Sequence, residues 1–234
     1  MIDLLLVILG RNIKNKIVMD NLLLSFPRSG NTWVRYFLEF LSKRPTSIGL
    51  VENCQKGVSK KDAIAIDPAV DFLEKCVVIK RHRADHDWDN WSSNNCNLLF
   101  LLRNPKECII RHSRDGNDLE SCIEGFVHCL KFYHNFQGKK KLISYEQLLQ
   151  DPKKNILEIL KFLDISFDHV DDFFRNFEEH RRKSVRNYGA AFTQGDKNQL
   201  YKHSRMQPKK ANYIINQLKN QNPELFDIYL QKYD

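Results

Sequence analysis

The most informative stretch of the sequence is LLLSFPRSGNTW, residues 22–33. Its first five residues are almost all apolar, which is typical of a strand buried on both faces of a parallel sheet. A polar turn over Pro27 to Gly30 follows, and residues 32–42 carry apolar side chains at helical spacing. The first N–H groups of a helix lack partners and point outward, so this P-loop-like strand, loop and helix can bind an anion. The alternative interpretation is a strand followed by an ordinary capped helix.

Further short apolar runs follow along the chain and alternate with amphipathic patterns. The runs are residues 76–79, 98–102 and 141–145. A helix is predicted from Asp151-Pro152, an N-cap with proline at the first helical position, to about Leu163. Strands that alternate with helices predict an α/β fold, in which a central parallel β-sheet is flanked by helices.

The length of 234 residues predicts a single domain over 1–234. Residues 1–20 would form an N-terminal extension. From about residue 167 the pattern is helical and strongly charged, with helices expected near 208–220 and 223–233. We interpret 167–234 as a helical C-terminal elaboration that could include a lid.

The composition is that of a soluble globular chain, with 42% hydrophobic and 28% charged residues. These values argue against disorder, collagen-like repeats and a membrane bundle. Lys and Arg exceed Asp and Glu by 37 to 29, a net charge of +8. An anionic ligand is the simplest explanation of this excess, and a solvated, Lys-rich surface is the alternative.

The cysteines and the N-terminus predict a cytoplasmic protein. The six cysteines include no C-x-x-C pair, and several lie in apolar stretches. Free thiols in a reducing compartment are therefore expected, and neither a disulfide framework nor a zinc site. The apolar run at residues 4–9 is too short to span a bilayer, and an acidic residue precedes it, so no signal peptide is expected.

The loop after the first predicted strand lacks the features of an ordinary ATP-binding site. The Walker A pattern G-x-x-x-x-G-K-[ST] is missing. The strand 98–102 is followed by Arg103, where a Walker B aspartate would hold Mg²⁺. We expect the anion to be neutralised by arginine and no metal to be needed.

Residues 26–33, FPRSGNTW, resemble the 5′-phosphosulfate loop of sulfotransferases that use 3′-phosphoadenosine 5′-phosphosulfate (PAPS). That pattern is P-[KR]-S-G-[TN]-T-W. The resemblance implies PAPS as co-substrate, with 3′-phosphoadenosine 5′-phosphate (PAP) as product. It also implies that Arg28 holds the transferring sulfuryl group. The residues implied to bind the cofactor in this loop are Arg28, Ser29, Gly30, Asn31, Thr32 and Trp33.

Two later stretches resemble the remaining nucleotide contacts of the same family. RNPKE, residues 103–107, resembles the 3′-phosphate motif, which makes Arg103 a phosphate ligand. The family commonly has a serine eight residues later, where this chain has Arg111; Arg111 is preferred as the second contact, and Ser113 is the alternative. Tyr145, in a Tyr-Glu pair after the last predicted strand, is implied to lie near the adenine. Without the resemblance, a half-buried tyrosine at a strand end explains it equally well.

His82 is the candidate general base, because it follows a predicted strand at the end where ligand sites of α/β proteins gather. Imidazole titrates near neutral pH, and neighbouring cations would keep it neutral, as a base must be. Lys80-Arg81-His82 resembles the Lys-Thr-His of the family, which implies His82 as base and Lys80 beside the transferring group. Glu39 and His86 are the reserve candidates.

The sequence therefore predicts a PAPS-dependent sulfotransferase that moves a sulfuryl group to a hydroxyl or amine by in-line displacement. The acceptor would be a small molecule or a saccharide, and no nucleic-acid partner is expected. A P-loop-like nucleotide kinase and a non-catalytic polyanion or nucleic-acid binder are the alternatives. The family's usual lid motifs are incomplete, because residues 181–184 lack a glycine and residues 195–197 lack a tryptophan.

Overall fold

The computed structural model describes residues 20–48, 69, 71, 75–82, 96–189 and 208–234. The strands are β1 (Asp20–Ser25), β2 (Ser47–Ile48), β3 (Ile79–Arg81), β4 (Cys96–Leu102) and β5 (Lys140–Ser144). The α-helices are α1 (Asn31–Ser42), α3 (Pro105–Ser113), α4 (Leu119–Asn135), α5 (Tyr145–Gln150), α6 (Pro152–Phe162), α7 (Val170–Arg175), α8 (Phe177–Gly189), α9 (Pro208–Gln221) and α10 (Pro223–Leu225). A π-helix over Phe226–Leu230 and a 3₁₀ turn over Gln231–Tyr233 complete the described chain.

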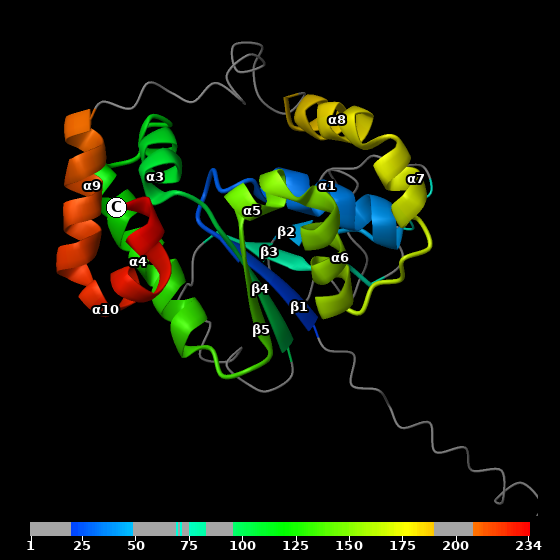
Figure 1. Cartoon of the computed structure of the whole chain (residues 1–234), viewed down its shortest axis with the longest axis horizontal. Coiled ribbons are helices and arrows are strands. Elements are labelled where there is room, and N and C mark those ends of the chain that lie inside the picture. Colours follow the sequence, from blue (N-terminus) through cyan, green and yellow to red (C-terminus); the bar gives the residue numbers. More distant parts are fainter. Residues whose placement is uncertain (1–19, 49–68, 70, 72–74, 83–95, 190–207) are drawn as a thin grey trace, which may run out of the picture.

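The described strands form one parallel sheet in the order β2-β3-β1-β4-β5. Side chains alternate between its two faces, as the period of a strand requires. Leu22 and Leu24 of β1 join one core cluster with α3, α4 and α9, whereas Leu23 joins the other with α1 and α6. Figure 1 shows these two groups of helices on opposite sides of the sheet. The predicted α/β fold is confirmed.

The strand order places β1 at the centre, between β3 and β4. The chain moves outward from β1 to the β2 edge, and later crosses β1 to form β4 and β5. Ligands of open parallel sheets bind at the carboxyl ends of the strands where the order reverses in this way. The ends of β1, β3 and β4 therefore mark the expected site.

One local prediction needs correction, and two short elements were missed. The strand predicted at 76–79 begins only at Ile79, because Val77 N–H donates to the Pro45 carbonyl oxygen at 2.8 Å, outside the ladder. The two-residue strand β2 was not predicted, since so short an edge strand leaves no periodic pattern. The short helix α5 precedes the predicted helix α6, and a capping box between Ser144 and Gln147 begins it.

The helix predicted from Asp151 is found as α6. The Asp151 side chain accepts a hydrogen bond from Lys154 N–H at 3.1 Å, and Pro152 is the first helical residue. The five cysteines in the described ranges are buried, and none of them forms a disulfide with another described cysteine. Within those ranges, none of the helices is long and apolar enough to cross a membrane.

Candidate functional site: an arginine-rich crevice at the strand ends

The loop between β1 and α1 has the backbone of an open helix N-terminus. Gly30 is the N-cap with φ 96°, and no side chain caps the helix. A Cβ atom at Gly30 would collide with the ring of Tyr145. Glycine is therefore required here both for its left-handed backbone and for the close approach of the Tyr145 ring.

The polar side chains of this loop are buried and only partly satisfied. Asn31 Nδ2 donates to Ser25 Oγ at 2.9 Å. Asn31 Oδ1 and Ser29 Oγ are buried, with no oxygen or nitrogen partner among the described residues. Thr32 is half-buried beside them. Buried polar atoms almost always have an oxygen or nitrogen partner, so these two atoms fit a site that a polar ligand completes.

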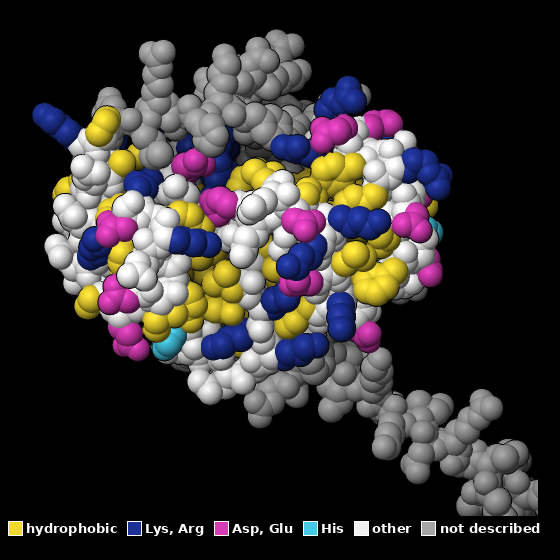
Figure 2. Space-filling model, viewed as in Figure 1, with side chains coloured by type: hydrophobic (Ala, Val, Ile, Leu, Met, Phe, Trp, Pro, Cys, Tyr) yellow, Lys and Arg dark blue, Asp and Glu magenta, His cyan; other side chains and the backbone are white. Residues whose placement is uncertain are grey.

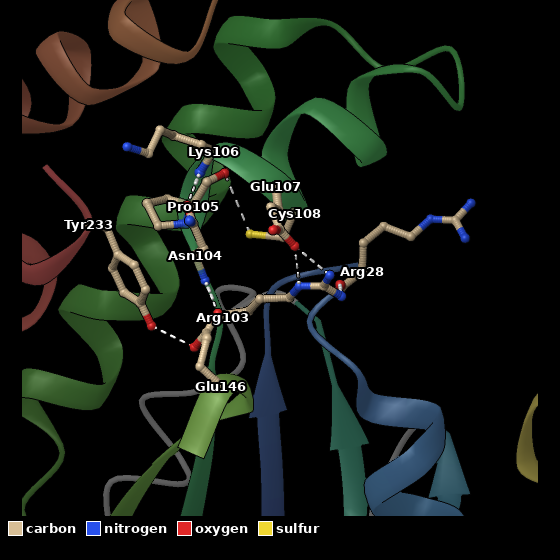
Figure 3. A network of polar contacts seen from close by, with 9 residues as sticks. All are labelled: Arg28, Arg103, Asn104, Pro105, Lys106, Glu107, Cys108, Glu146 and Tyr233. Atoms are coloured by element: carbon tan, nitrogen blue, oxygen red, sulfur yellow. Dashed lines mark hydrogen bonds and ion pairs between the residues drawn. The ribbon is translucent and has the colours of Figure 1, made fainter. Parts of the chain in front are cut away.

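Arg103 follows β4 and contacts both the loop and Tyr145. One of its terminal nitrogens donates to the Arg28 carbonyl oxygen at 3.1 Å, and another donates to Glu107 at 2.5 Å (Figure 3). Its guanidinium carbon lies 4.4 Å from the centroid of the Tyr145 ring. These contacts hold a buried cation in one orientation. A nucleobase would have to share the Tyr145 ring with Arg103.

Two more arginines lie close to Arg103. Burial, and then the charges of Arg103 and Arg28, lower the pKa of Arg111 from its ordinary value. Arg111 has no hydrogen bond or ion pair within the described ranges, whereas the Ser113 hydroxyl donates to the Ile110 carbonyl oxygen at 3.0 Å. The structure thus leaves Arg111 available to an anion and engages Ser113 in its own helix.

The Arg28 side chain is occupied by a residue that the sequence analysis missed. Its Nε and a terminal nitrogen donate to the two carboxylate oxygens of Asp115 at 2.9 and 2.6 Å. Asp115 lies in the turn between α3 and α4, which the chain pattern around residue 28 does not reveal. An anion at the loop would have to compete with this carboxylate for Arg28.

His82 lies directly after β3 with a defined tautomer. Its Nδ1 atom is 2.9 Å from the carbonyl oxygen of Ser25, which can only accept, so the proton of the neutral ring lies on Nδ1. Burial, together with the positive charge of Lys80, lowers the pKa of His82 to about 4. The ring is therefore neutral at physiological pH, with a lone pair on Nε2, as a general base requires.

Lys80 is the middle residue of the three-residue strand β3, two residues before His82, and is half-buried. Burial, and then the charge of Arg35, lower its pKa to about 8. Its ammonium group is charged at neutral pH, but it loses its proton more readily than an exposed lysine.

Glu39, one of the two reserve bases, is engaged by its neighbours. Glu39 is fully buried, and its carboxylate accepts hydrogen bonds from the Thr46 hydroxyl and N–H, with Arg35 3.9 Å away. This carboxylate serves the packing of α1 against β2. His86 lies outside the described residues.

The Trp33 ring lies in an aromatic cluster with Phe37, Phe173 and Phe177. Of the two incomplete lid motifs, residues 181–184 lie in α8 and residues 195–197 lie outside the described ranges. In the parts of the chain that are described, no group of three His, Cys, Asp or Glu side chains could hold a metal ion. On the face shown in Figure 2, acidic and basic side chains are interspersed, with no single basic patch.

Comparison with known proteins identifies sulfotransferases. No family model matches the chain. Human Sulfotransferase 1C2 is 22% identical over 183 residues, which cover 64% of this chain and 60% of the human protein. Mouse Sulfotransferase 1B1 is 25% identical over 182 residues, with the same coverage of 64% and 60%. The chain thus spans less than two thirds of the length of these relatives.

Solved sulfotransferase structures resemble the fold. A sulfotransferase from Alicyclobacillus acidocaldarius has a TM-score of 0.50 at 12% identity, covering 90% of this chain and 95% of that one. Mouse sulfotransferase SULT7A1, solved with PAP, has a TM-score of 0.48 at 14% identity, covering 92% and 85%. The resemblance to sulfotransferases inferred from the motifs is thus confirmed by sequence similarity.

Proposed function

We propose that this chain, which resembles sulfotransferases in sequence and fold, transfers a sulfuryl group from PAPS to a hydroxyl or amine acceptor. The observation that carries the proposal is the convergence of an open helix N-terminus, three arginines and a neutral histidine at one edge of the sheet. An anion would be held by the N–H groups at the start of α1 and by Arg28. A second phosphate would be held by Arg103 and Arg111.

Different residues would bind the 5′ group and the adenine of the nucleotide. Ser29, Gly30, Asn31 and Thr32 surround the helix N-terminus, where the 5′ group would bind. Trp33 would support this turn through its aromatic cluster. Tyr145 would contact the adenine while its ring also packs against the Arg103 guanidinium. PAPS, when bound, supplies a sulfuryl group on a phosphate leaving group.

His82 is proposed as the base for the acceptor. As the acceptor oxygen or nitrogen bonds to sulfur and the bond from sulfur to the phosphate oxygen breaks, Nε2 of His82 takes the acceptor proton. Nδ1 keeps its own proton and donates it in a hydrogen bond to the Ser25 carbonyl oxygen, which fixes the ring orientation. Lys80 and Arg28 are proposed to stabilise the negative charge that develops on the transferring group and the leaving oxygen. The acceptor would be a small molecule or a saccharide.

Thermal unfolding with PAP, ADP and ATP–Mg²⁺ tests the nucleotide site. A ligand at 100 times its Kd adds about 2.7 kcal/mol of stability, so PAP should raise the Tm by roughly 5–10 °C in a chain of this size. Arg103→Ala should abolish the rise. The matched control is Arg175→Ala, because Arg175 is 75% exposed on α7.

An equal Tm rise with ATP–Mg²⁺ would contradict the proposal and favour a nucleotide kinase. Binding that ignores the nucleoside and falls steeply with salt would instead indicate a polyanion binder. If PAP binds selectively, a screen of phenols, amines and saccharides with PAPS identifies the acceptor. His82→Ala should then lower turnover by orders of magnitude and leave PAP binding in place.

A further inference from the structure

The carboxylate of Glu146 joins two distant parts of the chain behind the arginine crevice. Its Oε1 accepts a hydrogen bond from the backbone N–H of Asn104 at 2.9 Å. Its Oε2 accepts one from the hydroxyl of Tyr233 at 2.7 Å. Figure 3 shows the Glu146 carboxylate with Asn104 above it and Tyr233 to its left. Neither partner is near Glu146 in sequence.

The Asn104 N–H belongs to the peptide bond that follows Arg103. Fixing this N–H therefore fixes the backbone just after β4 that carries the Arg103 side chain. On its other side Asn104 is the N-cap of α3, where its side chain accepts from Lys106 N–H at 3.0 Å. The peptide after Arg103 is thus held both by α3 and by Glu146.

Tyr145, the residue before Glu146, contacts the side chain of Arg103. Tyr145 lies under the guanidinium of Arg103, at 4.4 Å from ring centroid to guanidinium carbon. Both Tyr145 and Glu146 belong to the first turn of α5, which the Ser144–Gln147 capping box fixes. One helical turn therefore sets both the backbone and the side chain of Arg103.

Tyr233 determines where the Glu146 carboxylate lies. The tyrosine is only 8% exposed, and its hydroxyl is directed at Oε2. Without that hydroxyl, a half-buried carboxylate oxygen would lose its donor, and the carboxylate would turn toward water. Burial and the neighbouring Glu146 raise the pKa of Tyr233, so the phenol stays a donor at all working pH values.

We propose that Glu146 and Tyr233 are positioning residues for Arg103. Affinity for a 3′-phosphate then depends on the Tyr233 hydroxyl. The inference rests on the proposed function. It adds a specific dependence, since neither residue is among the proposed nucleotide contacts. Removing the Tyr233 hydroxyl should weaken only the part of the affinity that the 3′-phosphate contributes.

The contribution of the 3′-phosphate to affinity can be measured by isothermal titration calorimetry with PAP and with adenosine 5′-phosphate, which lacks that group. It is the ratio of the two Kd values. Tyr233→Phe should reduce the preference for PAP about fivefold, the effect of one hydrogen bond, and change adenosine 5′-phosphate affinity less than about twofold. The matched control is Tyr229→Phe. Tyr229 is in the same segment, but its hydroxyl bonds His134 at 3.2 Å, and its loss should leave the ratio unchanged.

A double-mutant cycle tests the route through Arg103. In the Arg103→Ala background, adding Tyr233→Phe should have no further effect on the ratio. Equal weakening of both nucleotides by Tyr233→Phe, or an unchanged ratio, would overturn the proposal and leave the proposed function intact. A wild-type protein that binds the two nucleotides equally would overturn the proposed function itself.

Discussion

The Nδ1 atom of His82 lies 2.9 Å from the carbonyl oxygen of Ser25. This relationship follows from the sheet register, because β1 and β3 are parallel with Leu24 opposite Arg81. The residues that follow, Ser25 and His82, therefore end at the same edge. The contact fixes the tautomer and directs the basic nitrogen of the ring away from the sheet.

The low pKa of His82, about 4, predicts that this base stays neutral down to an unusually low pH. A base works in its neutral form, and His82 stays neutral until the pH falls toward 4, whereas an ordinary histidine is half-protonated near pH 6.5. NMR titration of the histidine rings should show one imidazole that remains an Nδ1–H tautomer down to about pH 5. A His82 signal that titrates near 6.5 would contradict the burial described above.

With an acceptor identified, His82→Ala should lower turnover by about 10²–10⁴-fold, the usual contribution of a general base. The Kd of PAP should change little, because the imidazole meets the acceptor. Glu39→Gln serves as the control for the reserve base, with stability monitored since its carboxylate is buried. If Glu39→Gln and not His82→Ala removed turnover, the base would have been assigned wrongly.

The protonation of Lys80 predicts how the affinity for PAP changes at alkaline pH. Its pKa of about 8 means that the ammonium is present below pH 8 and is lost as the pH rises through that value. Affinity for PAP at constant ionic strength should therefore fall between about pH 7 and 9. The Lys80→Arg variant keeps the positive charge throughout, so its affinity for PAP should not change over that pH range. Identical pH profiles in the two proteins would remove Lys80 from the site.

The parts of this site that the sequence predicted are those encoded locally. The loop around Gly30, Arg103 after its strand, and His82 after β3 each lie within a few residues of a recognisable strand end. Asp115 and Tyr233 were missed because they contact Arg28 and Glu146 across 87 residues of sequence in each case. Such pairings depend on how helices pack. The capping box that begins α5 was visible in the sequence and could have predicted that helix.

Asp115 predicts a gain in affinity on mutation. Its carboxylate competes with the nucleotide for Arg28, and exposed ion pairs contribute about 0.2–1 kcal/mol, so Asp115→Asn should tighten PAP binding up to about fivefold. The exposed Asp227→Asn removes the same charge elsewhere and controls for the change in net charge. The difference between the two variants should shrink as salt is added. Equal effects of the two variants would mean that Arg28 does not contact the nucleotide.

Two glycines provide a matched test of the contact between the loop and Tyr145. Gly30 and Gly116 have similar left-handed backbones, with φ of 96° and 90°. A Cβ atom at Gly30 meets the Tyr145 ring, whereas one at Gly116 has nothing within 4 Å. Gly116→Ala should therefore show the cost of the backbone alone, about 1–2 kcal/mol, or a Tm lower by roughly 2–8 °C.

Gly30→Ala should cost more than Gly116→Ala, and it should also reduce the preference for PAP over adenosine 5′-phosphate. The added methyl group displaces the Tyr145 ring, and Arg103 then loses the surface that carries its guanidinium. Tyr145→Ala in the Gly30→Ala background should recover part of the lost stability, because it removes the clash. It should not recover the preference for PAP. Equal destabilisation in the two single variants, with nucleotide binding unchanged, would show that the ring moves aside freely and does not hold Arg103.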